Sequence, residues 1–270
     1  MAYRLLWVTD PHLEFLSEER DRKARFLEVL SNESADAVLI TGDVSNAANL
    51  EEDLNCLAQL NKPAYFVLGN HDFYGDTISG SIEVAQRAVG RYPERLIYLD
   101  DSWVIRLTSQ TKLIGVNGFA DGLSGRGWRT TARINDFFQI QNFVALPSDA
   151  ARFNLMRTLA QAATDKLRRK LMAAAPESDR VIIATHVPPF IDSSFHEGKI
   201  GSPEYLPFFS CPTMGKMLLE IAEQFPSVRF EVFAGHTHSP ALLYQPLPNL
   251  SVEVDGAQYG SPKISRVLEL

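Results

Sequence analysis

The chain has 270 residues, of which 45% are hydrophobic and 22% are charged, and such proportions are typical of a globular protein with a buried core. They exclude a chain that is wholly disordered, collagen-like or coiled coil. The 33 acidic and 26 basic side chains give a net charge of −7, which disfavours binding to large nucleic acids and to anionic membranes.

Apolar strands and amphipathic helices alternate over the first hundred residues. Short buried strands are predicted at 5–8, 37–40 and 64–68. Apolar residues recur at helical spacing in three further segments, at 26–30, 50–60 and 78–89. Alternation of strands and helices with short loops predicts right-handed βαβ units and a largely parallel sheet.

The pattern changes after residue 96. Three short apolar segments with only turns between them, at 97–99, 103–107 and 112–116, predict a second sheet or an antiparallel extension of the first. Residues 119–149 are irregular, whereas 150–174 are rich in Ala, Leu, Arg and Lys and are predicted to form one long helix. We expect a single domain over 1–270, with a lid inserted at about 119–175.

The remaining residues return to strands, with one more helix predicted at 213–225. The strands are expected at 181–185, 229–234, 242–244, 252–254 and 264–268. A long proline-containing loop is expected at 187–212. Loops of this length are uncommon inside a compact domain unless they serve a site.

The chain carries only two cysteines, Cys56 and Cys211, which are too few for a disulfide framework. We therefore expect free thiols in a reducing compartment. The apolar run at 5–8 is too short for a signal peptide or a membrane span, and no later run approaches 18 apolar residues. These features predict a soluble, cytoplasmic protein without a membrane segment.

Histidine is concentrated at the ends of predicted strands. Of the six histidines, all except His196 come directly after a strand, namely His12, His71, His186, His236 and His238. Loops at the carboxyl ends of parallel strands are where α/β folds place their sites. We therefore expect these histidines to meet at one edge of the sheet structure.

Each motif alone has an ordinary structural explanation. Asp10 and His12 can belong to a turn, Asp43 can cap a helix, and His186 can be a buried core residue. The segments Gly69-Asn70-His71-Asp72 and Gly235-His236-Thr237-His238 are harder to explain as turns, because they add titratable side chains that a turn does not need.

Together the motifs supply two aspartates, one asparagine and four histidines as candidate metal ligands: Asp10, His12, Asp43, Asn70, His186, His236 and His238. This set is too large for one tetrahedral zinc and suits two ions that share a carboxylate. Its mixture of imidazole, carboxylate and amide favours manganese, iron or zinc over magnesium or copper(I). Two such ions can hold a hydroxide between them while it attacks phosphorus.

The five motifs, in this order, resemble those of the calcineurin-like metallophosphoesterase family, and they extend from residue 10 to residue 238. The resemblance implies an α/β fold in which two mixed sheets, flanked by helices, form a four-layer α/β/β/α sandwich. It also implies a division of the ligands, with Asp10, His12 and His238 at the first metal, Asp43 between the two, and Asn70, His186 and His236 at the second.

The resemblance gives His71 a catalytic role beside the metals rather than on them. His71 would donate a proton or a hydrogen bond to the leaving-group oxygen or to a non-bridging phosphate oxygen. Asp72 either orients His71 or only holds the loop, and both alternatives stay open.

The residues after Asp43 are Val44-Ser45-Asn46-Ala47, in place of the aspartate–arginine–glycine extension of protein serine/threonine phosphatases. We therefore expect a small soluble phosphomonoester or phosphodiester, such as a nucleotide, as the substrate. Candidates for binding it are Arg126, Arg129 and His196, which can equally be ordinary surface residues. The alternative function is a catalytically silent metal-binding scaffold of the same fold, although such proteins usually lose ligands and this chain keeps all seven.

Overall fold

The first sheet has five strands in the order β13-β1-β2-β3-β4. Its parallel strands are β1 (Arg4–Val8), β2 (Ala37–Thr41), β3 (Ala64–Val67) and β4 (Leu96–Tyr98), and β13 (Arg266–Glu269) is antiparallel to β1. The computed structural model describes residues 2–16, 18–196, 198–239 and 242–270. Strands β1, β2 and β3 are apolar runs because a parallel sheet is covered on both faces.

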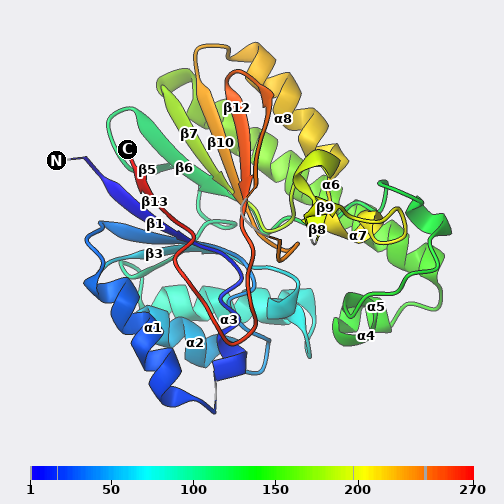
Figure 1. Ribbon diagram of the computed structural model, residues 1–270, viewed down its shortest axis with the longest axis horizontal. Coiled ribbons are helices and arrows are strands. Elements are labelled where there is room, and N and C mark those ends of the chain that lie inside the picture. The colour runs from blue at the N-terminus through cyan, green and yellow to red at the C-terminus, as the bar shows by residue number, and fades with distance from the viewer. Residues whose placement is uncertain (1, 17, 197, 240–241) are drawn as a thin grey trace.

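Three helices cover the outer face of the first sheet (Figure 1). They are α1 (Arg20–Asn32), α2 (Leu50–Leu57) and α3 (Ile78–Arg91). On α2 the apolar stripe Leu50, Leu54 and Leu57 is buried, as its helical spacing predicts. The chain therefore alternates strands and helices from β1 to β4, which confirms the predicted βαβ organisation of the first hundred residues.

The second sheet has six strands in the order β11-β12-β10-β7-β6-β5. Their bounds are β5 (Ile105–Arg106), β6 (Thr111–Gly115), β7 (Arg180–Ala184), β10 (Arg229–Ala234), β11 (Leu242–Leu247) and β12 (Leu250–Val254). The central strands are parallel, whereas β5 and β11 are antiparallel to their neighbours. Helices α6 (Asp149–Ala174) and α8 (Pro212–Gln224) pack on each other along the outer face of this sheet (Figure 1).

The two sheets face each other across a layer of apolar side chains. Along β1 the side chains of Leu5 and Trp7 enter this layer, while Leu6 and Val8 point toward the helices, as the two-residue period of a strand requires. Trp7 meets Phe233 of the second sheet edge to face, with ring centroids 5.0 Å apart. Helices, sheet, sheet and helices thus form four layers, and the predicted α/β sandwich of two mixed sheets is confirmed.

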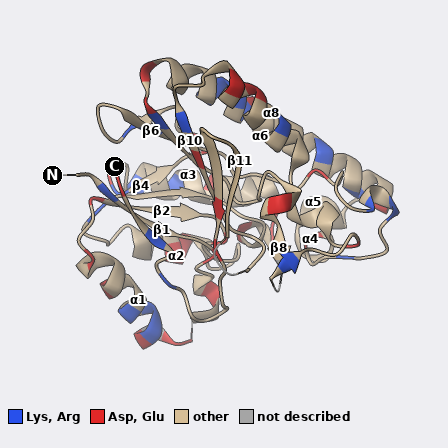
Figure 2. Ribbon diagram, turned by 45° about the horizontal axis from the view of Figure 1, so that its top comes forward, with Lys and Arg blue, Asp and Glu red and all other residues tan. Residues whose placement is uncertain are grey.

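Lys170 of α6 joins the two sheets from within the core. Its ammonium donates to the carbonyls of Leu99 and Asp100, which follow β4, and to the carbonyl of Gly115, which ends β6, at 2.6–2.8 Å. Charged residues of both signs are interspersed along the helices, while the strands are mostly uncharged (Figure 2). Among the described residues, no helix combines the length and the apolar character needed to cross a membrane.

Two details of the predicted element pattern are wrong. The segment at 97–99 is predicted to lie in a second sheet or in an antiparallel extension of the first, but β4 belongs to the first sheet and pairs with β3 in parallel. An apolar run gives no sign of which sheet it will join. The expected loop at 187–212 is not structureless, since it contains a hairpin of β8 (Phe195–His196) and β9 (Lys199–Ile200) and the helix α7 (Leu206–Phe209).

The segment between β6 and α6 contains two single-turn helices, α4 (Asp136–Gln139) and α5 (Gln141–Val144). Short 3-10 turns occur elsewhere, at Leu13–Leu16, His71–Phe73, Gly127–Arg129, Ala175–Glu177 and Ile191–Ser193. Helix α6 buries residues along its whole length and contacts α8 and β6. It therefore forms part of the helical layer over the second sheet.

Candidate metal centre

The seven predicted ligands meet where the two sheets end. Asp10 and His12 follow β1, Asp43 follows β2 and Asn70 follows β3, all in the first sheet. His186 follows β7 and His236 and His238 follow β10 in the second sheet. Parallel strands bring their carboxyl ends to one edge, so loops far apart in the sequence become neighbours.

The backbone at these positions is strained. Five of the seven residues have positive φ angles although none is glycine: Asp10 (47°), His12 (44°), Asp43 (48°), His236 (71°) and His238 (51°). Such a conformation costs about 1–3 kcal/mol for a non-glycine residue and concentrates at functional sites. Gly69 also allows a close approach, because a Cβ there would collide with the Asp43 carboxylate.

Four of the ligands form the first cluster. Nε2 of His12 lies 3.1 Å from Nε2 of His238. A carboxylate oxygen approaches each of these nitrogens, with Asp43 Oδ2 3.7 Å from His12 and Asp10 Oδ1 3.5 Å from His238. These atoms are close enough to one another to hold a metal ion.

The remaining three ligands form the second cluster around the amide oxygen of Asn70. This Oδ1 lies 3.0 Å from Nε2 of His186 and 2.9 Å from Nδ1 of His236. The other oxygen of Asp43, Oδ1, lies 3.4 Å from Nε2 of His186. The Asp43 carboxylate therefore stands between the two clusters and faces each of them with one oxygen.

Hydrogen bonds behind the clusters fix three of the imidazole rings. Nδ1 of His186 donates to the carbonyl of Thr41, and Nε2 of His236 donates to the carbonyl of Phe208, both at 2.9 Å. Nδ1 of His12 donates to Oε1 of Glu14 at 3.2 Å. Each ring then presents the lone pair of its other nitrogen to its cluster.

Those lone pairs point at other acceptors. In the second cluster, two imidazole lone pairs face the amide oxygen of Asn70, and in the first, His12 and His238 face carboxylates. Acceptors that converge in this way repel one another unless a proton or a metal cation lies between them. The donor set of nitrogen and oxygen atoms therefore fits metal cations.

The Asn70 amide is held in the orientation that this arrangement needs. Its Nδ2 donates to the Tyr74 hydroxyl and to Oδ1 of Asp136, both at 2.9 Å, and the hydroxyl itself donates to Asp136 at 2.6 Å. Because the nitrogen is committed to this pair, the oxygen must face His186 and His236. Tyr74 and Asp136 were not found from the sequence, and Asp136 lies 66 positions from Asn70.

Burial and neighbouring charges shift the pKa values of the histidines in the centre. Burial disfavours the imidazolium of His186, but Asp43 and Asp10 beside it raise its pKa to about 10. Burial and the neighbouring charge of His186 lower the pKa of His236 to about 4. Despite burial, His186 and His71 hold the pKa of Asp43 well below its usual range. The centre thus concentrates anionic charge that would attract cations.

His71 lies beside the clusters, and its backbone N–H donates to Oδ1 of Asp43 at 2.8 Å. Its Nδ1 lies 3.7 Å from Oε1 of Glu14, the oxygen that also accepts from His12. Burial opposes protonation, but Asp43 and Glu14 raise the pKa of His71 above its usual value. Glu14 was missed in the sequence, although its position two residues after His12 was a usable signal.

Asp72 contacts the backbone. Its Oδ1 accepts from the N–H of Ser45 at 2.8 Å, and its Oδ2 accepts from the N–H of Gly69 at 2.7 Å. The carboxylate thereby ties the loop after β2 to the loop after β3. Those loops carry Asp43 and Asn70, so Asp72 holds the two ligands at a fixed separation.

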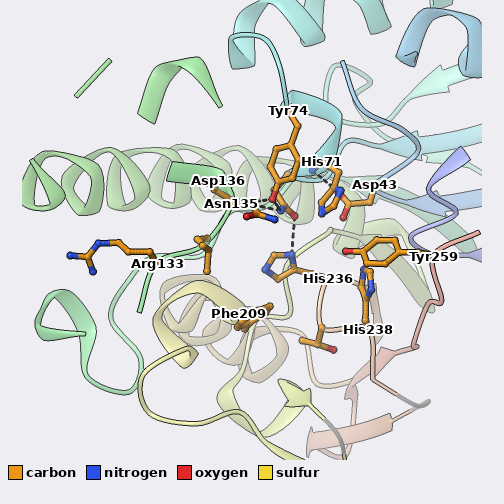
Figure 3. A pocket seen from close by; sticks show the side chains of 13 residues that line it. Asp43, His71, Tyr74, Arg133, Asn135, Asp136, Phe209, His236, His238 and Tyr259 are labelled. Carbon is orange, nitrogen blue, oxygen red and sulfur yellow. Dashed lines mark hydrogen bonds between the residues drawn. The ribbon is translucent and has the colours of Figure 1, made fainter. Parts of the chain in front are cut away.

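A cavity of about 410 Å³ opens over the centre, and side chains of both clusters line it together with His71, Tyr74 and Asp136 (Figure 3). Tyr259, from the segment after β12, forms a further wall, with its ring centroid 4.7 Å from that of His12. No sequence signal pointed to Tyr259, which lies far along the chain from His12.

The candidate substrate-binding arginines lie elsewhere. Arg126 pairs with Glu204 at 2.8 Å, and Arg129 lies over the ring of Trp128. Neither is among the residues that line the cavity, whereas Arg133 is. Arg133 itself pairs with Asp149. The side chain of His196 lies outside the described part of the structure.

Two facing mixed sheets with a paired His/Asp/Asn centre at their common edge define a protein of the metallophosphoesterase class. The family model described as Calcineurin-like phosphoesterase matches residues 3–240. The chain belongs to this family, which confirms the resemblance of its motifs. Family membership implies a phosphate ester as the substrate.

Solved structures share the fold at low sequence identity. TT1561 of Thermus thermophilus has 13% identity and a TM-score of 0.57 over 95% of this chain and 90% of that chain. A dimetal phosphatase from Danio rerio has 15% identity and a TM-score of 0.55 over 94% and 88%. GAP50, the anchor in the inner membrane complex of Plasmodium, has 11% identity and a TM-score of 0.51 over 94% and 71%. No curated protein matches the chain.

Proposed function

We propose that the protein hydrolyses small phosphate esters with two metal ions, which are manganese, iron or zinc. The observation that carries this proposal is the position of Asp43. Each oxygen of its carboxylate faces a different cluster of ligands, at 3.7 Å from His12 and at 3.4 Å from His186. A buried carboxylate shared in this way is what a two-metal site requires.

The ligands would divide between the two ions as the motifs imply. Asp10, His12 and His238 would hold one ion, Asn70, His186 and His236 would hold the other, and Asp43 would contact both. When bound, the ions would supply Lewis-acid stabilisation of the phosphate oxygens and a nucleophilic water.

The residues of the chain would position the ester and move its proton. His71 lines the cavity, and its Nδ1 faces Glu14, so Nε2 is the nitrogen that would donate to the leaving-group oxygen. Asp72 would act through the loops and not on the substrate.

The experiment combines metal analysis with turnover. Protein loaded with manganese should hydrolyse 4-nitrophenyl phosphate or its bis(4-nitrophenyl) diester, and Asp43→Ala should lose both the metal and the activity. Asp165→Ala, an exposed position on α6, is the matched control and should keep both. Metal binding without turnover of any monoester, diester or nucleotide would favour the scaffold alternative, and a wild type that binds no divalent ion would refute the proposal.

A further inference from the structure

A second cavity adjoins the candidate metal centre. Its volume is about 530 Å³, within the range of ligand sites, and it is lined by Ser194, Phe195, Gly201, Ser202, Tyr205, Phe209 and Thr237. Phe209 and Thr237 also line the cavity over the metal centre. The two cavities therefore have these two residues in common, and we refer to the second cavity as the apolar subsite.

The described lining of the apolar subsite is largely aromatic and uncharged. Phe195, Tyr205 and Phe209 supply rings, while the other side chains are small or end in a hydroxyl. None of the described residues that line the subsite is Lys, Arg, His, Asp or Glu. Among these side chains a second phosphate or a carboxylate would find no counter-ion, whereas an uncharged ring would gain from leaving water.

The wall between the two cavities is built by specific contacts. Oγ of Ser194 donates to the carbonyl of Phe209 at 2.8 Å, which ties the β8–β9 hairpin to the end of α7. The ring of Phe209 lies 5.0 Å, centroid to centroid, from that of His236 (Figure 3). One residue thus contacts a candidate metal ligand and also forms part of the apolar surface.

Thr237 supplies an unused hydrogen-bonding group at the same junction. It stands between His236 and His238 in the sequence and is only 3% exposed. Its Oγ1 is buried and has no hydrogen-bond partner within the described residues. Buried hydroxyls are nearly always paired, so an unpaired hydroxyl at this junction is an unusual feature of the structure.

We infer that the apolar subsite binds the organic group of the phosphate ester, and that this group is uncharged, largely apolar and at least as large as one ring. The inference rests on the proposed function, because it needs the phosphate to occupy the metal centre. It narrows the substrate class: esters with further phosphates on the organic side are disfavoured, and aromatic or apolar esters are preferred.

The test measures binding rather than turnover. Methylphosphonate and benzylphosphonate share the phosphonate group, and only the second carries a ring. Both are titrated calorimetrically into manganese-loaded protein, with inorganic phosphate as a reference. Burial of the ring should make benzylphosphonate bind about tenfold to a hundredfold more tightly than methylphosphonate.

Two variants and one control locate the ring. Tyr205→Ala removes a wall residue that is 47% exposed, and Ser202→Trp fills the cavity from an exposed position. Each should reduce the advantage of benzylphosphonate at least about threefold and leave methylphosphonate unchanged. Ile200→Ala, on the same hairpin but outside the lining, should change neither ligand.

The possible results separate the inference from the proposal on which it rests. An advantage that is lost in both variants and kept in the control supports the apolar subsite. The absence of an advantage, or an advantage that both variants retain, overturns it while the phosphate site stands. Failure of phosphate and methylphosphonate to bind the manganese-loaded protein overturns the proposed function and the inference together.

Discussion

Replacement of Lys170 by methionine should cost the protein about 3 kcal/mol of unfolding free energy. The Lys170 ammonium donates to three backbone carbonyls, two after β4 of the first sheet and one at the end of β6 of the second. Burial lowers the pKa of Lys170 to about 8, so the ammonium is still the main form at pH 7. Methionine keeps the apolar stem but leaves the three acceptors without a donor.

The magnitude follows from those three contacts. A buried acceptor that loses its partner costs about 1–3 kcal/mol, and removal of the buried charge offsets part of that sum. For a chain of this size, about 3 kcal/mol corresponds to a decrease in Tm of roughly 6–12 °C. Because Leu99 and Gly115 belong to different sheets, the loss should weaken the packing between the sheets.

Urea unfolding at pH 7, followed by circular dichroism, measures the effect. Lys216→Met, at an exposed position on α8, is the matched control. Surface substitutions away from such contacts change stability by less than about 0.5 kcal/mol, so the control should unfold close to wild type. A Lys170→Met protein as stable as the control would refute the role assigned to the buried ammonium.

Three further predictions concern the centre and a buried thiol. Asp136→Ala frees the Asn70 amide to rotate, and the affinity for metal should fall about 10- to 100-fold by calorimetric titration. His71→Ala should keep its metal by elemental analysis but lower kcat by about 10²–10⁴ if the ring donates the proton. Burial raises the pKa of Cys211 to about 12, so this thiol ionises at a lower pH in the unfolded chain than in the folded protein. The stability advantage of wild type over Cys211→Ala, measured by urea unfolding, should therefore shrink as the pH rises from about 9 to 12.

The positions of the seven candidate ligands could be predicted because their signal is local. Each follows a buried strand, and the carboxyl ends of parallel strands must meet at one edge. The structure places Asp10 beside His238 and Asn70 beside His186 and His236, which is the grouping that the motifs imply. That these residues bind metal stays a prediction until ions are measured.

The surroundings of the ligands could not be predicted in the same way. Asp136 orients Asn70 from a single helical turn in an irregular segment, and Tyr259 covers His12 from near the end of the chain. Neither position carries a periodic or spacing signal, because its role depends on the three-dimensional path of a loop. For the same reason the sequence did not predict that β4 pairs with β3 in parallel, since strand pairing is decided by packing over long range.

The division of ligands between two sheets couples the centre to the stability of the whole fold. Four of the ligands follow strands of the first sheet, namely Asp10, His12, Asp43 and Asn70. The other three, His186, His236 and His238, follow strands of the second sheet. Ions that bind across this boundary would bind the folded state alone, and mass action would then stabilise the packing of one sheet on the other. The contacts that Lys170 makes with both sheets act on the same boundary. Added manganese should therefore restore part of the stability that Lys170→Met removes. It should restore no stability to the double variant that carries both Lys170→Met and Asp43→Ala.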